Sequence, residues 1–468
     1  MMRPSGLLVA LLMAPFWSAS GSVNHYRKLR QMATLPHSDV GEPLLLSPFI
    51  AEGRISEGQE AARVPPFAGN VVSYAGFLTV NETYNSNLFF WYFPAEKANG
   101  TTPLALWLQG GPGATSLFGL FEEHGPYYID KKGQARLRHY SWTRKLSMLY
   151  IDNPVGTGFS FTDDDRGYVT NQEQVGQDLY SALIQFFQLF PELQKQDFYV
   201  TGESYAGKYV PAIAYAIHKR NPTAPLKINL KGLAIGNGLC DPEHMLGHYG
   251  DYLNQLGLLD EKTLAEFRAA QDLGIKFIRE KKWGDASAVF DKIINGDFDS
   301  NSMFLNASGF TFYFNYLHEK PPQEADFSAF VQSDAARQAL HVGNATFHTD
   351  QKVETMLKDD LMKSVRPWVE ELLGQYRVLI YNGQLDIIVA YPLTVGFLQA
   401  LQFDAASEYK IAPRHIWHVG PHIAGYCKSA GNLTEVLVRD AGHMVPGDQP
   451  IWALDMITRF TRNKAFHS

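Results

Sequence analysis

The sequence predicts an α/β fold in which helices cover both faces of a mostly parallel central sheet. Short runs rich in aliphatic, aromatic and β-branched residues recur along the chain, and helix-like segments separate several of them. Strands that alternate with helices pair in parallel, because each connection crosses a face of the sheet. The chain has 468 residues, of which 45% are hydrophobic and 19% are charged. This composition suits a large buried core.

The individual elements follow from local patterns. A helix is predicted over 171–190, where apolar residues recur on one face with a period of about 3.6. A second helix is predicted over 205–218, and Pro211 is tolerable there only near the helix start. The predicted strands are bounded by turn signals. They span 74–80, 88–93, 104–108, 146–152, 197–201, 230–236, 377–381 and 433–439.

The chain is expected to divide into consecutive segments with different roles. Residues 21–66 show little periodicity and are predicted to be an N-terminal arm or pro-segment. Residues 240–350 are charged and helix-prone, which predicts a helical cap insertion where a cover over the site could grow. The core is then assembled from 67–239 and 351–468.

The first twenty residues are typical of a secretory signal peptide. Arg3 precedes the short apolar run 7–17, and small residues follow at 18–20. The run is too short to span a bilayer comfortably, and no later segment comes near about 18 uninterrupted apolar residues. We therefore expect entry into the secretory pathway without a membrane span; the lysosome, a yolk granule and the extracellular space all remain open. Predicted glycosylation sites are Asn81, Asn99, Asn306, Asn344 and Asn432.

The charge and the cysteine content argue against a nucleic-acid-binding protein and against a disulfide-rich scaffold. The net charge is −7 and no Lys/Arg block is present, so a nucleic-acid partner is not expected. Cys240 and Cys427 could form one bridge at most, and we expect both to be free and buried. No cofactor and no metal are predicted, and a homodimer is left open.

The stretch Gly202-Glu203-Ser204-Tyr205-Ala206-Gly207 predicts a nucleophilic serine. It joins the strand at 197–201 to the helix at 205–218. A serine on such a sharp turn is exposed above the sheet, and its small neighbours let the turn close. The start of the helix favours negative charge that develops nearby. The local pattern alone also fits an ordinary turn. The prediction of a nucleophile therefore depends on whether an acid and a base are available to act with Ser204.

Partners for this serine follow in the chain order of the α/β-hydrolase fold, which is Ser, Asp or Glu, then His. Asp386 comes just after the strand at 377–381, and His443 follows the strand at 433–439. We predict that Ser204, Asp386 and His443 form a catalytic triad. The glycine-rich loop after the strand at 104–108 predicts an oxyanion hole made by the N–H groups of Gly111 and Tyr205.

Four long motifs resemble the serine carboxypeptidase family. They are Trp107–Gly113, Asp152–Ser160, Gly202–Gly207 and Gly442–Pro446, and the resemblance runs from about Tyr74 to the C-terminus. Gly41–Leu46 and the Gln at position 109 further resemble the vitellogenic-like carboxypeptidase subgroup.

The resemblance implies an enzyme that releases single C-terminal amino acids from peptides and proteins through an acyl-enzyme, best at acidic pH. It assigns the substrate's terminal carboxylate to Glu203, assisted by Gln109 and Gly110. Two carboxyl groups can share a hydrogen bond only if one carries a proton, which agrees with an acidic optimum.

Three departures from the family pattern stand out. Gln109 replaces the usual Asn, and Ala114-Thr115-Ser116 replaces the usual Cys-Ser-Ser, so one family disulfide cannot form. The bridges that usually brace the insertion are also missing.

Two other functions remain open on the sequence: a carboxypeptidase-like acyltransferase and a non-catalytic yolk or storage protein. The retained triad argues against the storage role, and Glu203 with Gln109 favours peptide carboxylates.

Overall fold

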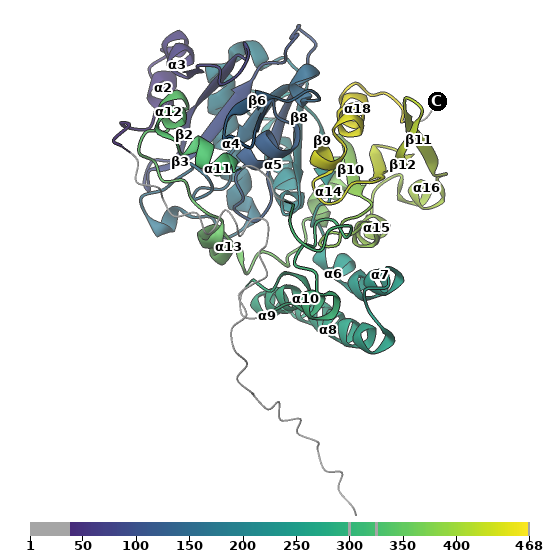
Figure 1. Cartoon of the computed structure of the whole chain (residues 1–468). Coiled ribbons are helices and arrows are strands. Elements are labelled where there is room, and N and C mark those ends of the chain that lie inside the picture. The colour runs from purple at the N-terminus through teal and green to yellow at the C-terminus, as the bar shows by residue number, and fades with distance from the viewer. Residues whose placement is uncertain (1–37, 298–300, 323–325, 467–468) are drawn as a thin grey trace, which may run out of the picture.

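The computed structural model describes residues 38–297, 301–322 and 326–466. The predicted signal peptide and the first part of the predicted arm, up to residue 37, lie outside these residues. Within them, one eleven-stranded sheet runs through the molecule in the order β1-β2-β3-β7-β4-β8-β9-β10-β13-β12-β11, and helices lie on both of its faces (Figure 1).

The centre of the sheet is parallel, as predicted. Its strands are almost completely buried runs, so both faces must be covered by helices or loops. In spatial order they are β7 (Ser147–Ile151), β4 (Leu104–Leu108), β8 (Phe198–Glu203), β9 (Leu230–Gly236), β10 (Arg377–Gly383) and β13 (Leu433–Val438).

The outer strands are antiparallel, which the sequence prediction of a mostly parallel sheet did not specify. On one side lie β3 (Ser86–Phe93), β2 (Ser73–Asn81) and β1 (Arg63–Val64); on the other lie β12 (His422–Ala430) and β11 (His415–Val419). No strand was predicted over 415–430, because this hairpin mixes His, Gly, Ser and Lys with few apolar residues and so lacks a clear alternation. A separate small hairpin pairs β5 (Tyr127–Ile129) with β6 (Ala135–Leu137).

Helices pack against the sheet at the predicted places. α4 (Gln172–Leu189) matches the predicted amphipathic helix, and α5 (Ala206–Arg220) follows the serine turn and packs beside α4. The other helices outside 240–350 are α2 (Ser47–Ala51), α3 (Ile55–Ala61), α13 (Gln351–Leu357), α14 (Arg366–Leu373), α15 (Tyr391–Ala400), α16 (Ala406–Ile411), α17 (Val445–Asp448) and α18 (Pro450–Thr461).

Segment 240–350 is helical in its described residues and adds no strand to the sheet there. Its helices α8 to α10 gather below the sheet in the view of Figure 1. The assignment of 240–350 as a cap over the site stays a prediction. The helices are α6 (Pro242–Met245), α7 (Tyr249–Gln255), α8 (Glu261–Arg279), α9 (Trp283–Phe290), α10 (Met303–Ser308), α11 (Phe327–Val331) and α12 (Asp334–Ala339).

The described end of the predicted arm is attached to the core. Leu46 N donates to the Phe77 carbonyl (2.9 Å), and Phe77 N donates to the Leu44 carbonyl (3.0 Å). Leu44 N in turn donates to the carbonyl of His341, beyond α12 (2.9 Å). Leu46 is completely buried over Gly76 in β2. The arm therefore joins β2 to the segment that follows α12.

Two further expectations can be compared with the structure. Cys240 and Cys427 are both free and buried, as expected. In the part of the chain that the structure describes, no helix is long and apolar enough to cross a membrane.

We predict that Leu46→Ala lowers the free energy of unfolding by about 2–5 kcal/mol, because it removes buried methyl groups and leaves a cavity over β2. Unfolding in urea measures this change. Leu317→Ala is the matched control, since Leu317 is 65% exposed and its truncation should change stability by about 0.5 kcal/mol or less. Equal, small effects of both substitutions would show that the arm is not part of the folded core.

Candidate active site

Ser204 lies on the strained turn that the sequence predicts. It has a φ of +62° at the end of β8, and α5 begins two residues later. A non-glycine residue in this region is unfavourable, so the surroundings must hold it. Ser204 N donates to the Gly236 carbonyl (3.0 Å), and the Ser204 carbonyl accepts from Gly207 N (2.9 Å) and Leu239 N (3.0 Å). These bonds fix the serine at the edge of the sheet.

The small neighbours of Ser204 are required by close backbone approaches. A Cβ on Gly202 would lie 2.5 Å from the Leu108 carbonyl oxygen, and one on Gly207 would lie 2.6 Å from Leu239 N. Either side chain would force the turn open. The glycine spacing seen in the sequence therefore has a steric cause.

His443 and Asp386 lie together beside this turn. His443 Nδ1 is 2.8 Å from Asp386 Oδ2, and both side chains are completely buried. The same carboxylate oxygen accepts from the side-chain amide of Asn237 (2.7 Å) and from Val389 N (3.3 Å). Sequence reasoning missed Asn237, although a polar residue directly after the central strand β9 was a signal for it.

The other ring nitrogen of His443 is available for proton transfer. Nε2 is buried and has no hydrogen-bond partner among the described residues. Ser204 Oγ therefore does not bond it in this conformation, and catalytic hydrogen bonds are often long before a substrate binds. Since Nδ1 faces the carboxylate of Asp386, Nε2 is the nitrogen that can act as a base.

A segment from within 240–350 connects the two loops that carry His443 and Asp386. The Phe314 carbonyl accepts from His443 N (2.7 Å), and the Phe314 ring stacks on the imidazole at a centroid distance of 4.8 Å. The Tyr313 carbonyl accepts from Ile387 N and Ile388 N, both at 3.1 Å. Sequence reasoning missed this role, because the run 312–316 is mainly aromatic and no pattern in it indicates a functional contact.

The predicted oxyanion donors lie next to Ser204. The backbone of Gly110 packs directly on the serine turn: a Cβ there would be 2.6 Å from Tyr205 N and 2.7 Å from Ser204 Cβ. Gly111 follows with a φ of +108°, which a side chain would disfavour. The loop after β4 and the start of α5 are thus neighbours, as an oxyanion hole of two backbone N–H groups requires.

Glu203 and Gln109 are hydrogen-bonded to each other in a buried position. Gln109 Nε2 donates to Glu203 Oε1 (2.7 Å), and Gln109 Oε1 accepts from the indole Nε1 of Trp107 (2.9 Å). The Trp107 contact fixes which way the amide points. The longer Gln side chain therefore still directs its N–H₂ group at the glutamate.

A second buried carboxyl, Glu123, lies against Glu203. It comes from the π-helix Gly119–His124, in which Gly119 packs so closely on the Trp107 indole that no side chain would fit. Sequence reasoning missed Glu123, although an acidic residue inside an apolar run was a signal for a buried carboxyl. A hydrogen bond between the two carboxyl groups requires that one of them holds a proton.

Burial sets the protonation of this carboxyl pair. Burial is the largest cause that raises the pKa of Glu203 to about 8; hydrogen bonds with Glu123 and Gln109 oppose this rise, and the charges of Asp386 and Asp448 add to it. Burial, followed by the charge of Glu203, also raises the pKa of Glu123 well above its usual value. The pair therefore holds a proton at pH values where exposed carboxyl groups have lost theirs.

Comparison with known proteins agrees with this geometry. The sequence model of the family described as "Serine carboxypeptidase" matches residues 65–463. The chain belongs to the serine carboxypeptidase family.

Relatives of similar length support this membership. The chain is 54% identical to the venom serine carboxypeptidase of Apis mellifera, over 96% of this chain and 97% of that one. It is 50% identical to the human probable serine carboxypeptidase CPVL, over 93% of each chain, and 48% identical to the vitellogenic carboxypeptidase of Aedes aegypti, over 94% of each. The predicted vitellogenic-like resemblance is therefore confirmed, and the protein is a serine-type carboxypeptidase, a hydrolase.

The fold also matches that of a solved carboxypeptidase. The prohormone-processing carboxypeptidase KEX1 of Saccharomyces cerevisiae aligns with a TM-score of 0.69 and 23% identity, over 86% of this chain and 96% of that one. This similarity confirms the predicted α/β-hydrolase fold.

Hydrogen bonds to Asp152 hold the loop that follows β4 in this carboxypeptidase. Thr115 Oγ1 and Ser116 N both donate to Asp152 Oδ1, at 2.5 and 2.9 Å, and Phe159 N donates to Asp152 Oδ2 (3.0 Å). Burial raises the pKa of Asp152 to about 6, and these hydrogen bonds limit the rise. The buried carboxylate thus joins the loop after Gly113 to the motif 152–160.

A buried ion pair lies behind Tyr205. Lys208 Nζ is 3.1 Å from Asp360 Oδ2 and also donates to the backbone carbonyls of Asp360 and Leu361. The Tyr205 hydroxyl (3.3 Å) and Gln172 Nε2 (2.7 Å) donate to the same carboxylate oxygen. Burial lowers the pKa of Lys208 to about 8 although Asp360 favours its charged form. The pair joins the first turn of α5 to the chain that returns after 240–350.

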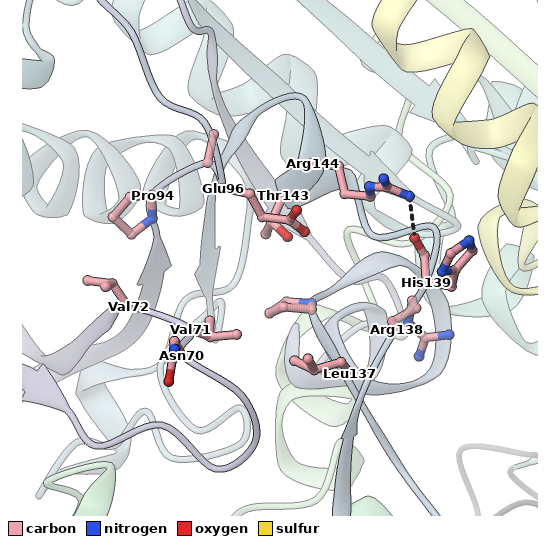
Figure 2. Close-up of a pocket in the computed structure, with 12 residues that line it drawn as sticks. Asn70, Val71, Val72, Pro94, Glu96, Leu137, Arg138, His139, Thr143 and Arg144 are labelled. Atoms are coloured by element: carbon pink, nitrogen blue, oxygen red, sulfur yellow. Dashed lines mark hydrogen bonds between the residues drawn. The ribbon is translucent and has the colours of Figure 1, made fainter.

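A surface pocket of about 590 Å³ lies apart from these residues. Val72 and Leu137 contribute apolar surface, and Arg138, His139 and Arg144 contribute polar groups (Figure 2). Arg144 donates to the His139 carbonyl (2.9 Å). None of the predicted site residues lines this pocket, so it is not the candidate active site.

The predicted glycosylation sites differ in accessibility. Asn99, Asn306 and Asn344 are exposed, whereas Asn81 and Asn432 are partly buried. Asn344 Nδ2 donates to Asp39 (2.7 Å), and Asn432 Nδ2 donates to the Leu373 carbonyl (2.9 Å). A glycan on Asn432 would have to form beside this contact with the core.

We predict that Lys208→Met lowers the free energy of unfolding by about 3–5 kcal/mol, because it leaves the Asp360 charge buried without its partner. The double variant Lys208→Met/Asp360→Leu should recover much of this loss, since it removes both charges. Unfolding in guanidinium chloride measures both. Lys219→Met, at an exposed ion pair with Glu371, is the control and should stay near the wild type. A double variant as unstable as the single one would contradict this account.

Proposed function

We propose that this carboxypeptidase releases single C-terminal amino acids from peptides through an acyl-enzyme on Ser204, and that the terminal carboxylate binds at acidic pH and is lost as pH rises through about 8. One observation carries the proposal. A buried, proton-holding pair of carboxyl groups, Glu203 and Glu123, lies directly beside the serine turn. Such a pair holds a proton that it can donate to a carboxylate.

In the proposed reaction Ser204 Oγ attacks the carbonyl carbon of the last peptide bond. Its proton moves to His443 Nε2, while Asp386 holds Nδ1–H and stabilises the imidazolium. The N–H groups of Gly111 and Tyr205 donate to the oxyanion that forms. The C–N bond then breaks as His443 returns the proton to the departing amino acid. Water, activated by the same imidazole, hydrolyses the ester on Ser204.

The proposed specificity for a chain end comes from a proton. The substrate's terminal carboxylate is ionised across most of the pH range, so it can bind the acidic pair only as an acceptor from a protonated carboxyl. The Gln109 amide and the Gly110 backbone assist. When the pair ionises, it repels the substrate. An internal peptide segment has no carboxylate and gains nothing from this contact.

We also propose that the enzyme acts after entering the secretory pathway. The predicted signal peptide and the exposed sites at Asn99, Asn306 and Asn344 support this proposal. Relatives named for venom and for vitellogenesis agree with it.

We expect Ser204→Ala to reduce the release of C-terminal amino acids from a peptide library by about 10⁴-fold or more, because the acyl-enzyme cannot form. Mass spectrometry of the products measures it, and a fluorophosphonate should label the wild type but not this variant. Ser181→Ala, on α4, controls for the loss of a hydroxyl. A wild type that transfers acyl groups to alcohols but releases no amino acid would support the acyltransferase instead. One that reacts with neither probe would support the storage role.

The KM for peptides with a free carboxylate should rise with pH, because the pair must be protonated to bind. The pKa of Glu203 is raised to about 8, so tight binding is present below this value and lost as pH rises through it. We expect a KM increase of about tenfold per pH unit beyond that point. Steady-state kinetics over this range checks it, with the matching peptide amides as controls. A KM equally flat for acids and amides would contradict the proposal.

A further inference from the structure

The register of three central strands places Tyr381 in one row with Glu203. Glu203 on β8 pairs with Gly236 on β9, and Gly236 pairs with Tyr381 on β10. Residues that pair in neighbouring parallel strands project to the same face of the sheet. Glu203 and Tyr381 therefore point to the same face and are separated only by a residue that has no side chain.

The Tyr381 ring occupies the space that a side chain at position 236 would fill. A Cβ on Gly236 would lie 2.5 Å from the Tyr381 hydroxyl oxygen and even closer to ring carbons. The phenol thus lies across β9 toward β8. Because neighbouring strands are about 4.8 Å apart, its hydroxyl ends about one strand spacing from Glu203.

The Tyr381 hydroxyl and several oxygens of the carboxyl pair are buried polar atoms without hydrogen-bond partners. Tyr381 Oη is buried and has no partner among the described residues. Apart from each other's carboxyl groups, Glu203 Oε2 and both oxygens of Glu123 also have none there. Buried polar atoms are rarely left without partners. A phenol is a donor and an ionised carboxylate is an acceptor, so these atoms complement one another.

Electrostatics agrees with this complementarity. Burial raises the pKa of Tyr381 well above its usual value, and the charges of Glu203 and Glu123 raise it further. The phenol therefore keeps its proton wherever the enzyme works. It can only donate toward the pair, and it cannot compete for the proton that the pair holds.

We propose that Tyr381 is a positioning residue for the carboxylate-binding pair: its hydroxyl donates to Glu203 and Glu123, directly or through one ordered water. The inference rests on the proposed function. A donor stabilises the ionised form of a carboxyl group. Tyr381 thereby lowers the pH at which the pair loses its proton and the substrate's carboxylate is released.

Other charged groups face the pair from neighbouring elements, and they stay in place when only Tyr381 changes. Asp386 and Asp448 raise the pKa of Glu203, and His443 and Arg138 lower that of Glu123. None of them shares the strand row of Glu203. A substitution that removes the Tyr381 hydroxyl alone therefore isolates its contribution.

Tyr381→Phe should move the pH midpoint of the KM rise upward by about 0.5–1 unit, so that KM at a fixed pH well above the wild-type midpoint falls about threefold to tenfold. The pH profile for peptide amides, which have no terminal carboxylate, should not move. Tyr127→Phe is the matched control. Tyr127 is also completely buried, and burial raises its pKa to about 12 with no contribution from either glutamate. Its midpoint should equal that of the wild type.

A second substitution tests the opposite direction without changing the shape of the core. 3,5-Difluorotyrosine at position 381 is a stronger donor, so the midpoint should move downward. An unmoved midpoint in both variants, or an equal shift in Tyr127→Phe, would overturn the inference. If Tyr381→Phe does not fold, the pH midpoint of the 3,5-difluorotyrosine protein alone tests the inference. A wild type that releases no amino acid defeats the proposed function, whereas an active wild type with unmoved variants defeats only the role of Tyr381.

Discussion

Parallel pairing of β4, β8, β9 and β10 is the constraint on which the rest of the site depends. It brings the C-terminal ends of these strands to one edge in a fixed register. Gln109, Glu203 and Tyr381 are therefore positioned by strands rather than by flexible loops. The strained backbone of Ser204 is held by the neighbouring strand through Gly236. Rigid strands place reacting groups more accurately than loops do. The sheet therefore sets the distance between the proposed nucleophile and the groups proposed to hold the substrate.

Burial does two different things at this edge. At Asp386 it is compensated on one oxygen, because the side chains of His443 and Asn237 both contact Oδ2, whereas Oδ1 has no partner among the described residues. Around Glu203 and Glu123 it is compensated incompletely, so the pair keeps a proton instead of two charges. The carboxyl groups at this edge are thus held differently: Asp386 is bonded to an imidazole nitrogen, and the Glu203–Glu123 pair is suited to donate to an anion.

Much of the fold and part of the site could be predicted from the sequence. Central strands were predictable because burial on both faces leaves continuous apolar runs, and so were the places of Ser204, Asp386 and His443 after such strands; their joint catalytic role stays a prediction. Glu123 was missed because it lies in a short π-helix, and the apolar spacing of the sequence does not indicate such an irregular turn. The β11–β12 hairpin and the Phe314 segment were missed because their places depend on tertiary contacts. Local sequence reports such contacts poorly.

The link between Phe314 and the loops of His443 and Asp386 has a consequence for how the enzyme matures. Both loops are tied to backbone groups of 313–316, which lie far away along the chain. Contacts between residues so distant in sequence close long loops, and this entropic cost slows folding. The imidazole and its carboxylate are then aligned only when 240–350 has reached its final place. A chain in which 240–350 has not docked would therefore lack the contacts that position both groups.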